Sequence, residues 1–249
     1  MKDAYFIYGM LVLAVFAAAA YGVRVMVWGV ARSERVAKIG GTALVGQELM
    51  DWTYWAMSPI VRGLTAMRIT PNMLTWAACI LGFGAGIALA LGWFGLATAL
   101  ATWSTLGDIL DGQVARMTNT GSDRGELLDA AVDRYTEFAF LAGLVIFYRA
   151  EVWLMVLTML ALCASFMISY TSAKAEALQV NPPRGLMRRH ERATYLITGA
   201  GLTALLGDWI AAHRLPSTTP MIAGLLAVAL IGNAAAVIRL YRIGQALPK

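Results

Sequence analysis

Four aspartates with helical spacing stand out, because they lie in or beside segments apolar enough to cross a membrane. Asp108 and Asp111 are three residues apart, and Asp129 and Asp133 are four apart, so each pair projects from one face of its own helix. Ionised groups in apolar surroundings cost free energy and usually have a function. Four carboxylates brought together repel one another unless cations balance them, and hard divalent cations prefer oxygen ligands. The spacing therefore predicts a metal site at the end of two facing transmembrane helices.

Small residues and an arginine follow the first aspartate pair. Gly112 comes directly after Asp111, and Ala115 lies one helical turn beyond it. Small side chains let either a neighbouring helix or a flat ligand approach the backbone closely, and the residues alone leave both interpretations open. Arg116 suits bidentate binding of a phosphate, although an arginine at the end of a span also commonly reaches the membrane surface.

The start of the second helix carries acidic residues of a different kind. Asp123 and Glu126 have the spacing of a capping box, so we assign both to capping and not to chemistry. Gly125 lies between them and is expected to keep this turn open beside the carboxylates.

The composition places these helices in a membrane. The chain has 249 residues, of which 59% are hydrophobic and only 14% are charged, whereas about a quarter of the residues in a soluble domain are charged. We therefore expect an all-α polytopic membrane protein in contact with membrane lipid. The net charge of +5 fits cytoplasmic loops that meet anionic lipid or phosphate, and we expect no nucleic-acid partner.

The apolar runs predict seven spans and one helix on the membrane surface. The first run, 5–23, competes with a signal peptide, but the basic residues that follow it favour a retained anchor. Aromatic and charged residues alternate in 46–66, which predicts an interfacial amphipathic helix interrupted at Pro59. Thr70 and Pro71 are a predicted N-cap and first helical residue. The six further spans are predicted at 71–91, 95–116, 125–148, 152–174, 193–212 and 218–240.

The loop charges predict the orientation in the membrane. Lys and Arg gather in 31–70, 117–124, 175–192 and the tail after Ile238, whereas the alternate loops contain few. By the positive-inside bias, the amino terminus lies outside and the aspartates lie at the cytoplasmic ends of their helices. We expect an integral protein of a bacterial inner membrane with its active site facing the cytoplasm.

The aspartate motif resembles the signature of a known enzyme family. The run Asp108-x-x-Asp111-Gly112-x-x-Ala115-Arg116, then eight residues, then Gly125-x-x-x-Asp129-x-x-x-Asp133, is similar to that of the CDP-alcohol phosphotransferases. The resemblance covers roughly 60–242 and implies a core of six transmembrane helices preceded by a juxtamembrane amphipathic helix. We therefore divide the chain into an N-terminal anchor and linker, 1–45, and a CDP-alcohol phosphotransferase membrane domain, 46–249. The helix at 5–23 lies outside the family pattern.

The resemblance also implies a role for each motif residue. Asp108, Asp111 and Asp129 would hold two divalent cations, Mg²⁺ or Mn²⁺, with Asp133 sharing one of them or acting as the catalytic base. The CDP moiety of CDP-diacylglycerol would be lined by Gly112, Ala115, Arg116 and Gly125. An acceptor hydroxyl would attack the phosphorus that carries the lipid, and CMP would leave. Members of the family are commonly homodimers, so we expect one here.

The acceptor is predicted from the basic segment 174–192. Positive-inside topology alone would explain its charge, but guanidinium groups also recognise phosphate well. The segment is similar to the phosphatidylinositol-phosphate synthase branch, which implies that Lys174, Arg189 and Arg192 bind a phosphorylated polar alcohol. Inositol phosphate is the acceptor that this branch implies. Glycerol-3-phosphate, giving phosphatidylglycerophosphate, is the close alternative, and Pro182-Pro183-Arg184 has no counterpart in the pattern.

Two further functions compete with this one. Intramembrane prenyltransferases also bind diphosphates with aspartate-rich helices and magnesium, but their aspartates cluster differently and lack the Gly-x-x-Ala-Arg element. A transporter would carry ionisable groups along a path through the bilayer, whereas the spans outside the motif are almost free of them.

Overall fold

The computed structural model describes residues 3–30, 36, 46–180 and 185–247, and every element assigned in this part of the chain is a helix. The helices are α1 (Tyr5–Trp28), α3 (Gln47–Ala66), α4 (Pro71–Ala90), α5 (Phe94–Thr118), α6 (Asp123–Phe147), α7 (Val152–Ala177), α8 (Arg189–Ala212) and α9 (Thr219–Ala246). The all-α prediction is confirmed. Most of the predicted linker within 1–45, and Arg184 with its two preceding prolines, lie outside the described residues.

The start of α4 agrees with its local sequence signal, whereas the cap of α6 differs from the predicted one. Thr70 caps α4 as predicted, because its hydroxyl accepts a hydrogen bond from the Met73 N–H at 3.4 Å, and Pro71 is the first helical residue. The cap of α6 was predicted at Asp123 but is Ser122, whose Oγ accepts from the Gly125 N–H at 3.2 Å. Ser122 has extended backbone dihedrals, which bring its hydroxyl over the first turn.

Asp123 and Glu126 therefore lie inside the first turn of α6. Their negative charge is still favourable there, because the N-terminal end of a helix carries a partial positive charge. A second correction concerns α3, which continues through Pro59 without interruption. Proline has a fixed φ compatible with a helix and removes one hydrogen bond, and this helix tolerates the loss.

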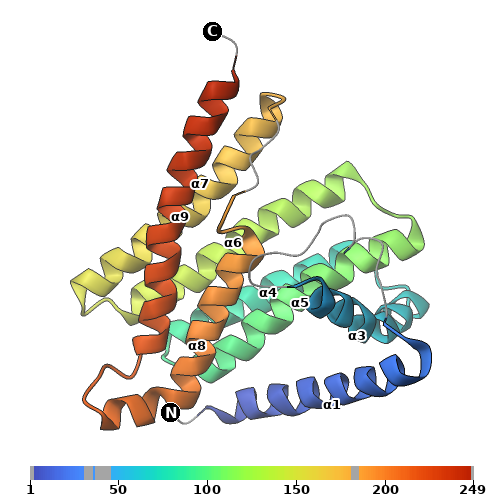
Figure 1. Cartoon of the computed structure of the whole chain (residues 1–249), viewed down its shortest axis with the longest axis horizontal. Coiled ribbons are helices and arrows are strands. Elements are labelled where there is room, and N and C mark those ends of the chain that lie inside the picture. Colours follow the sequence, from blue (N-terminus) through green and yellow to red (C-terminus); the bar gives the residue numbers. More distant parts are fainter. Residues whose placement is uncertain (1–2, 31–35, 37–45, 181–184, 248–249) are drawn as a thin grey trace.

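Helix α4 is the central support of the site-bearing helices. It packs against both α5 and α6, while α7 packs against α9, and α8 packs against α9 and α5. In Figure 1, α7 and α9 run side by side and extend upward beyond the rest, and α1 lies along the lower edge. The shared core of these helices is formed by Leu89, Phe94, Leu141, Leu144, Leu196, Met221, Leu225 and Val228.

Glycines bring the backbones of α4 and α6 into direct contact. A Cβ added at Gly86 would lie 2.7 Å from the carbonyl carbon of Ala139, and one added at Gly143 would lie 2.8 Å from that of Gly86. Real Cβ atoms do not approach a backbone so closely. The absence of side chains at these two positions therefore sets the separation between α4 and α6.

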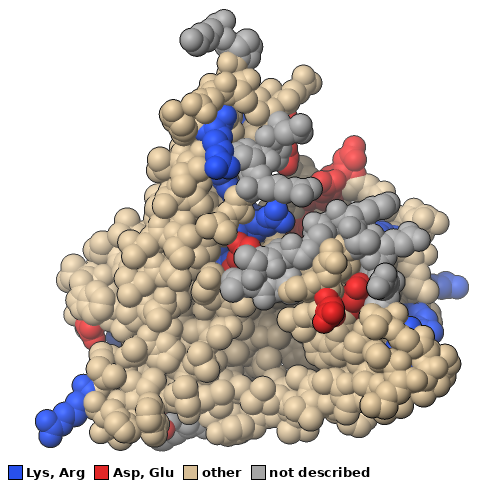
Figure 2. Space-filling view, viewed as in Figure 1, with Lys and Arg blue, Asp and Glu red and all other residues tan. Residues whose placement is uncertain are grey.

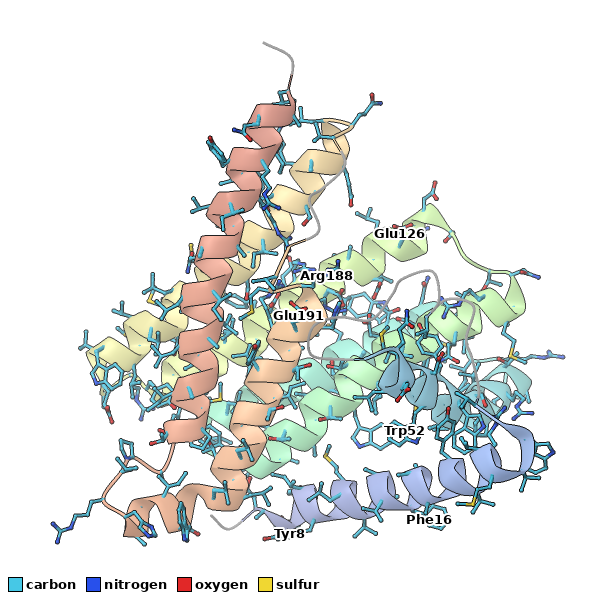
Figure 3. The ribbon with its side chains drawn as sticks, in the orientation of Figure 1. Tyr8, Phe16, Trp52, Glu126, Arg188 and Glu191 are labelled. Carbon is cyan, nitrogen blue, oxygen red and sulfur yellow. The ribbon has the colours of Figure 1, made fainter. Side chains whose placement is uncertain are left out.

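The exterior of the molecule fits a lipid environment. Among the described helices, α1, α4, α7, α8 and α9 are each long and apolar enough to cross a membrane. Helices α5 and α6 have 25 residues each and carry the charged motif. Tyr8 and Phe16 project from α1 away from the bundle (Figure 3), with 57% and 76% of their surface exposed. Figure 2 shows a mostly neutral face, with charged side chains in its middle and upper part and others at its edges.

Helix α1 is attached to the bundle at both of its ends. The Asp3 carboxylate accepts hydrogen bonds from the N–H groups of Gly95 and Leu96, at 2.7 and 3.1 Å, so it caps the start of α5. Ile7 is buried in the core beside it. Toward the other end, the ring of Tyr21 lies against that of Trp55 of α3 in a tilted arrangement, with ring centroids 5.1 Å apart.

Candidate active site

Three of the four predicted aspartates converge. Asp108 and Asp111 come from α5 and Asp129 comes from α6, and each offers a carboxylate oxygen within 4.8 Å of the other two. Helix α4, which packs against both helices, holds α5 and α6 at the separation that this convergence requires. The donors are all carboxylate oxygens, which is the donor set that Mg²⁺, Mn²⁺ and Ca²⁺ prefer. The residues present therefore fit a divalent metal.

A threonine on α4 orients the most buried member of this cluster. Asp111 is only 6% exposed, and its Oδ2 accepts a hydrogen bond from the Thr75 hydroxyl at 2.7 Å. Thr75 lies in the second turn of the helix that Thr70 caps. Its role was missed in the sequence, because a threonine inside an apolar helix carries no spacing signal that links it to a residue 36 positions later.

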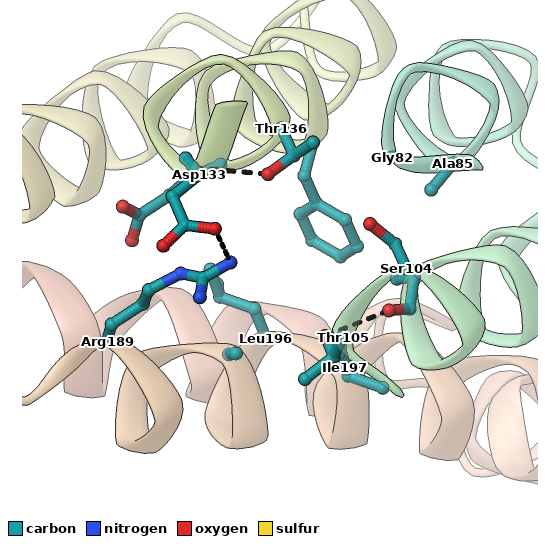
Figure 4. A pocket seen from close by; sticks show the side chains of 13 residues that line it. Gly82, Ala85, Ser104, Thr105, Asp133, Thr136, Arg189, Leu196 and Ile197 are labelled. Carbon is teal, nitrogen blue, oxygen red and sulfur yellow. Dashed lines mark hydrogen bonds and ion pairs between the residues drawn. The ribbon is translucent and has the colours of Figure 1, made fainter. Parts of the chain in front are cut away.

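Arg189 connects the cluster to the fourth aspartate. It is the first residue of α8, and its Nη1 donates to Asp108 Oδ2 at 2.6 Å. Its Nη2 forms an ion pair with Asp133 Oδ1, and Figure 4 shows this guanidinium facing the Asp133 carboxylate. One arginine thus bridges α5 and α6 from a third helix.

A large groove lies against the three converging aspartates. It has a volume of about 1200 Å³ and extends along the joint between α3 and α4 and the turn between α5 and α6. The four residues predicted for nucleotide binding all line it, together with Asp108, Asp111 and Asp129: Gly112, Ala115, Arg116 and Gly125. The arginine lies over the glycine, since a Cβ at Gly112 would be 3.2 Å from Arg116 Nη1.

Asp133 lines a different, smaller cavity. This space of about 70 Å³ lies among α4, α5, α6 and α8, and Arg189 also lines it. Figure 4 shows Ser104, Thr105 and Thr136 around it. Asp133 and Arg189 therefore line a different space from the predicted nucleotide residues.

The three residues predicted for the acceptor have different surroundings. Arg189 lies at the carboxylates, and Lys174 is exposed in the last turn of α7. Arg192 is 1% exposed, and its Nε and Nη2 donate to the Glu137 carboxylate at 2.7 and 2.9 Å. Its Nη1 donates to the Met187 carbonyl at 2.9 Å. Arg192 therefore fastens the segment before α8 to α6.

Two further polar residues secure the same segment. Arg239 of α9 is buried and donates to the Leu186 carbonyl and to Ser172 Oγ, each at 3.1 Å. Glu191 accepts a hydrogen bond from the Arg188 N–H at 3.1 Å and so caps α8. Arg188 and Glu191 are both labelled in Figure 3. A signal for Arg239 exists in the sequence, since it is a charge inside an apolar run, where ionised residues are rare and paired.

Comparison with known proteins identifies the family. Residues 68–238 match the family model described as CDP-alcohol phosphatidyltransferase. The phosphatidylinositol phosphate synthase of Mycobacterium tuberculosis is 36% identical over 154 residues, which are 59% of this chain and 69% of that protein. The synthase of the same name from Corynebacterium glutamicum is 34% identical over 156 residues, which cover 60% and 70% of the two chains.

Solved structures of the M. tuberculosis phosphatidylinositol phosphate synthase share the fold. The structure with CDP-DAG bound superposes with a TM-score of 0.66 at 27% identity, covering 75% of this chain and 92% of that one. The complex with manganese and citrate gives a TM-score of 0.67 at 27% identity, covering 75% and 88%. With its motif, its all-helical fold and a family match over residues 68–238, this chain belongs to the CDP-alcohol phosphatidyltransferase family of enzymes.

Proposed function

We propose that this enzyme transfers the phosphatidyl group of CDP-diacylglycerol to inositol phosphate and releases CMP, as a step of phospholipid synthesis. The convergence of Asp108, Asp111 and Asp129 within 4.8 Å on the wall of the large groove carries this proposal. The similar synthases named for phosphatidylinositol phosphate support the acceptor, and the neighbouring structure with CDP-DAG bound supports the donor.

The three converging aspartates would hold divalent cations, with Mg²⁺ or Mn²⁺ as the proposed ions. A bound pair of cations would neutralise the diphosphate and stabilise the attacking and leaving oxygens. A neighbouring structure contains manganese, which supports this choice of metal. Thr75 would keep the Asp111 carboxylate oriented, because its hydroxyl already occupies one of the carboxylate's lone pairs.

The groove residues would position the donor. Gly112 and Ala115 leave room for the nucleotide, and Arg116 supplies a cation for its phosphates. Gly125, at the start of α6, also lines the groove and adds no side chain that would narrow it. Phosphoryl-type transfer depends mainly on positioning and charge neutralisation, and these groups provide both.

Asp133 is the proposed base. It would accept the proton of the acceptor hydroxyl while the new bond forms between that oxygen and the phosphorus carrying the lipid, and the bond from this phosphorus to the CMP oxygen breaks. The separate cavity beside Asp133 supports this division of roles, because none of the four predicted nucleotide residues lines it.

The acceptor phosphate would be recognised by Lys174, Arg189 and Arg192. Lys174 is exposed and Arg189 is partly exposed, so both are able to meet a ligand directly. Arg192 would contribute by positioning, since its guanidinium is bound to Glu137 and Met187. We further propose a homodimer in a bacterial inner membrane with the site facing the cytoplasm; the basic loops and the bacterial relatives support this location.

The experiment that tests the function is a panel of acceptors. Purified protein with CDP-diacylglycerol and Mg²⁺ or Mn²⁺ should release CMP when inositol phosphate is added. Glycerol-3-phosphate, serine and free inositol are the comparison acceptors. Release with glycerol-3-phosphate alone would replace the proposed acceptor, and no release with any alcohol, from protein that is folded, would overturn the function itself.

A further inference from the structure

The positive charge of Arg189 lies between two of the aspartates. Its guanidinium contacts Asp108 on α5 and Asp133 on α6 at once. These carboxylates are largely withdrawn from solvent, with Asp133 buried. Two carboxylates in such surroundings are stable together only when a positive charge balances them. Arg189 supplies that charge from a helix that begins 81 residues after Asp108.

Asp108 is shared between this arginine and the proposed metal site. One of its oxygens belongs to the group that converges with Asp111 and Asp129, and its Oδ2 accepts the Arg189 hydrogen bond at 2.6 Å. A guanidinium and a divalent cation repel each other and compete for the same carboxylate. Binding of a divalent cation at Asp108 therefore weakens the arginine pair there.

We propose that Arg189 is an internal counter-ion of these carboxylates and that a divalent cation displaces it from Asp108. This inference rests on the proposed metal site and not on the identity of the acceptor. Because the same guanidinium holds Asp133, its departure also uncovers the proposed base. Metal binding and exposure of Asp133 are then coupled through this one side chain.

The surroundings of Arg189 allow this movement. It is the first residue of α8, and its side chain remains 33% exposed. By contrast, Arg192 on the next turn is fixed by three hydrogen bonds and is 1% exposed. The helix end is therefore held by Arg192, while Arg189 is joined to the carboxylates through contacts that a metal is able to replace.

The test measures metal affinity without substrate. Mn²⁺ binding to the full-length protein in detergent is followed from the EPR signal of free Mn²⁺. Arg189→Gln should bind Mn²⁺ about tenfold more tightly than the wild type, because a charged hydrogen bond no longer has to be broken; tenfold corresponds to about 1.4 kcal/mol. Unchanged or weaker binding would overturn the proposal, because that result is expected if Arg189 only joins α8 to the carboxylates and is not displaced by metal.

The matched control is Arg188→Gln, which removes the same charge from the adjacent residue. In the described part of the chain Arg188 has no ion pair with the aspartates. The Mn²⁺ affinity of Arg188→Gln should therefore differ from that of the wild type by less than twofold. Equal tightening in both variants would show a general charge effect and reject displacement. Wild-type protein that is folded but binds no Mn²⁺ would reject the metal site itself, and with it the proposed function.

A second measurement needs no variant and so remains decisive if Arg189→Gln does not fold. Phenylglyoxal modifies accessible guanidinium groups, and peptide mass spectrometry reports the extent at each arginine. Modification of Arg189 in the wild type should rise at least threefold when Mn²⁺ is added, while that of buried Arg192 stays low. An Arg189 signal that does not respond to Mn²⁺ would overturn the proposal.

Discussion

The surroundings of the four aspartates divide them into two groups at the scale of single residues. Asp108, Asp111 and Asp129 share one point of convergence on the large groove, whereas Asp133 faces Arg189 and a separate cavity. Residues of one type at regular spacing thus acquire different chemistry from their neighbours. This division supports the proposed roles, with metal binding by the converging three and proton transfer by the fourth.

Replacing Asp133 with asparagine should separate these roles. Asp133→Asn keeps the size of the side chain but cannot accept a proton, so CMP release should fall by about 10²- to 10⁴-fold, the usual contribution of a general base. Binding of CDP-diacylglycerol and of Mn²⁺ should persist, because the three converging aspartates are intact. A variant with full turnover would remove Asp133 from the proton-transfer step.

Thr75 offers a test of the support behind the metal site. Thr75→Val preserves the shape of the side chain but removes the hydrogen bond to Asp111, and loss of such a supporting contact typically weakens metal affinity by about 10- to 100-fold. The control is Thr102→Val, because the Thr102 hydroxyl bonds only within its own helix, to the Thr98 carbonyl. Mn²⁺ titration distinguishes them, and equal affinities for the two variants would contradict the role of Thr75.

At the scale of the elements, the position of α5 depends on contacts from outside the family region. Val61 of α3 packs against Leu110 and Val114 on α5, and Asp3 caps the other end of the same helix. The predicted division at residue 45 stays a prediction, but α1 does more than tether the protein. Asp3, just before α1, accepts hydrogen bonds from N–H groups at the start of a helix that carries two of the aspartates.

The cap provided by Asp3 is measurable as stability. Asp3→Ala should lower the free energy of unfolding by about 1 kcal/mol, which is typical of a lost helix cap. Asp3→Asn should lose less, because asparagine also caps well without a charge. Thermal unfolding of the detergent-solubilised variants checks this order. If the alanine and asparagine variants unfold together at the wild-type temperature, the Asp3 contacts do not support α5.

At the scale of the whole molecule, the site must face one side of the membrane. The turn between α5 and α6 lies at the groove, and the turn between α6 and α7 lies at the opposite end of α6. The positive-inside bias assigns the first turn to the cytoplasm. The proposed orientation therefore has the aspartates at the cytoplasmic end of α6.

Cysteine labelling tests this orientation. Arg124 and Arg149 are exposed; Arg124 lies in the first turn of α6, and Arg149 lies in the turn that follows this helix. In a Cys163→Ser background, Arg124→Cys should react with a membrane-impermeant maleimide only in inverted vesicles, and Arg149→Cys only in intact spheroplasts. Each variant serves as the control for the other. The reverse pattern would place the site outside the cell and contradict the proposed location.

Local sequence patterns determined most of the helices and the core of the site. Helical spacing predicted which faces Asp108, Asp111, Asp129 and Asp133 share, because side-chain direction along a helix follows from its periodicity. Length and apolarity predicted the spans for a similar reason. The cap at Ser122 instead of Asp123 shows the limit of such patterns, since adjacent cap-forming residues compete and backbone geometry selects one.

The tertiary structure alone decided which distant residues meet those aspartates. Thr75 reaches Asp111 across 36 residues, and Arg189 reaches Asp108 across 81. Nothing in local spacing specifies such pairs, because they depend on how α4 and α8 pack beside α5 and α6. The same packing separated the basic residues grouped by sequence, bringing Arg189 to the carboxylates and burying Arg192 against Glu137. The carboxylates were thus determined by periodicity along the chain, and their counter-ion by the packing of helices that the chain brings together only when folded.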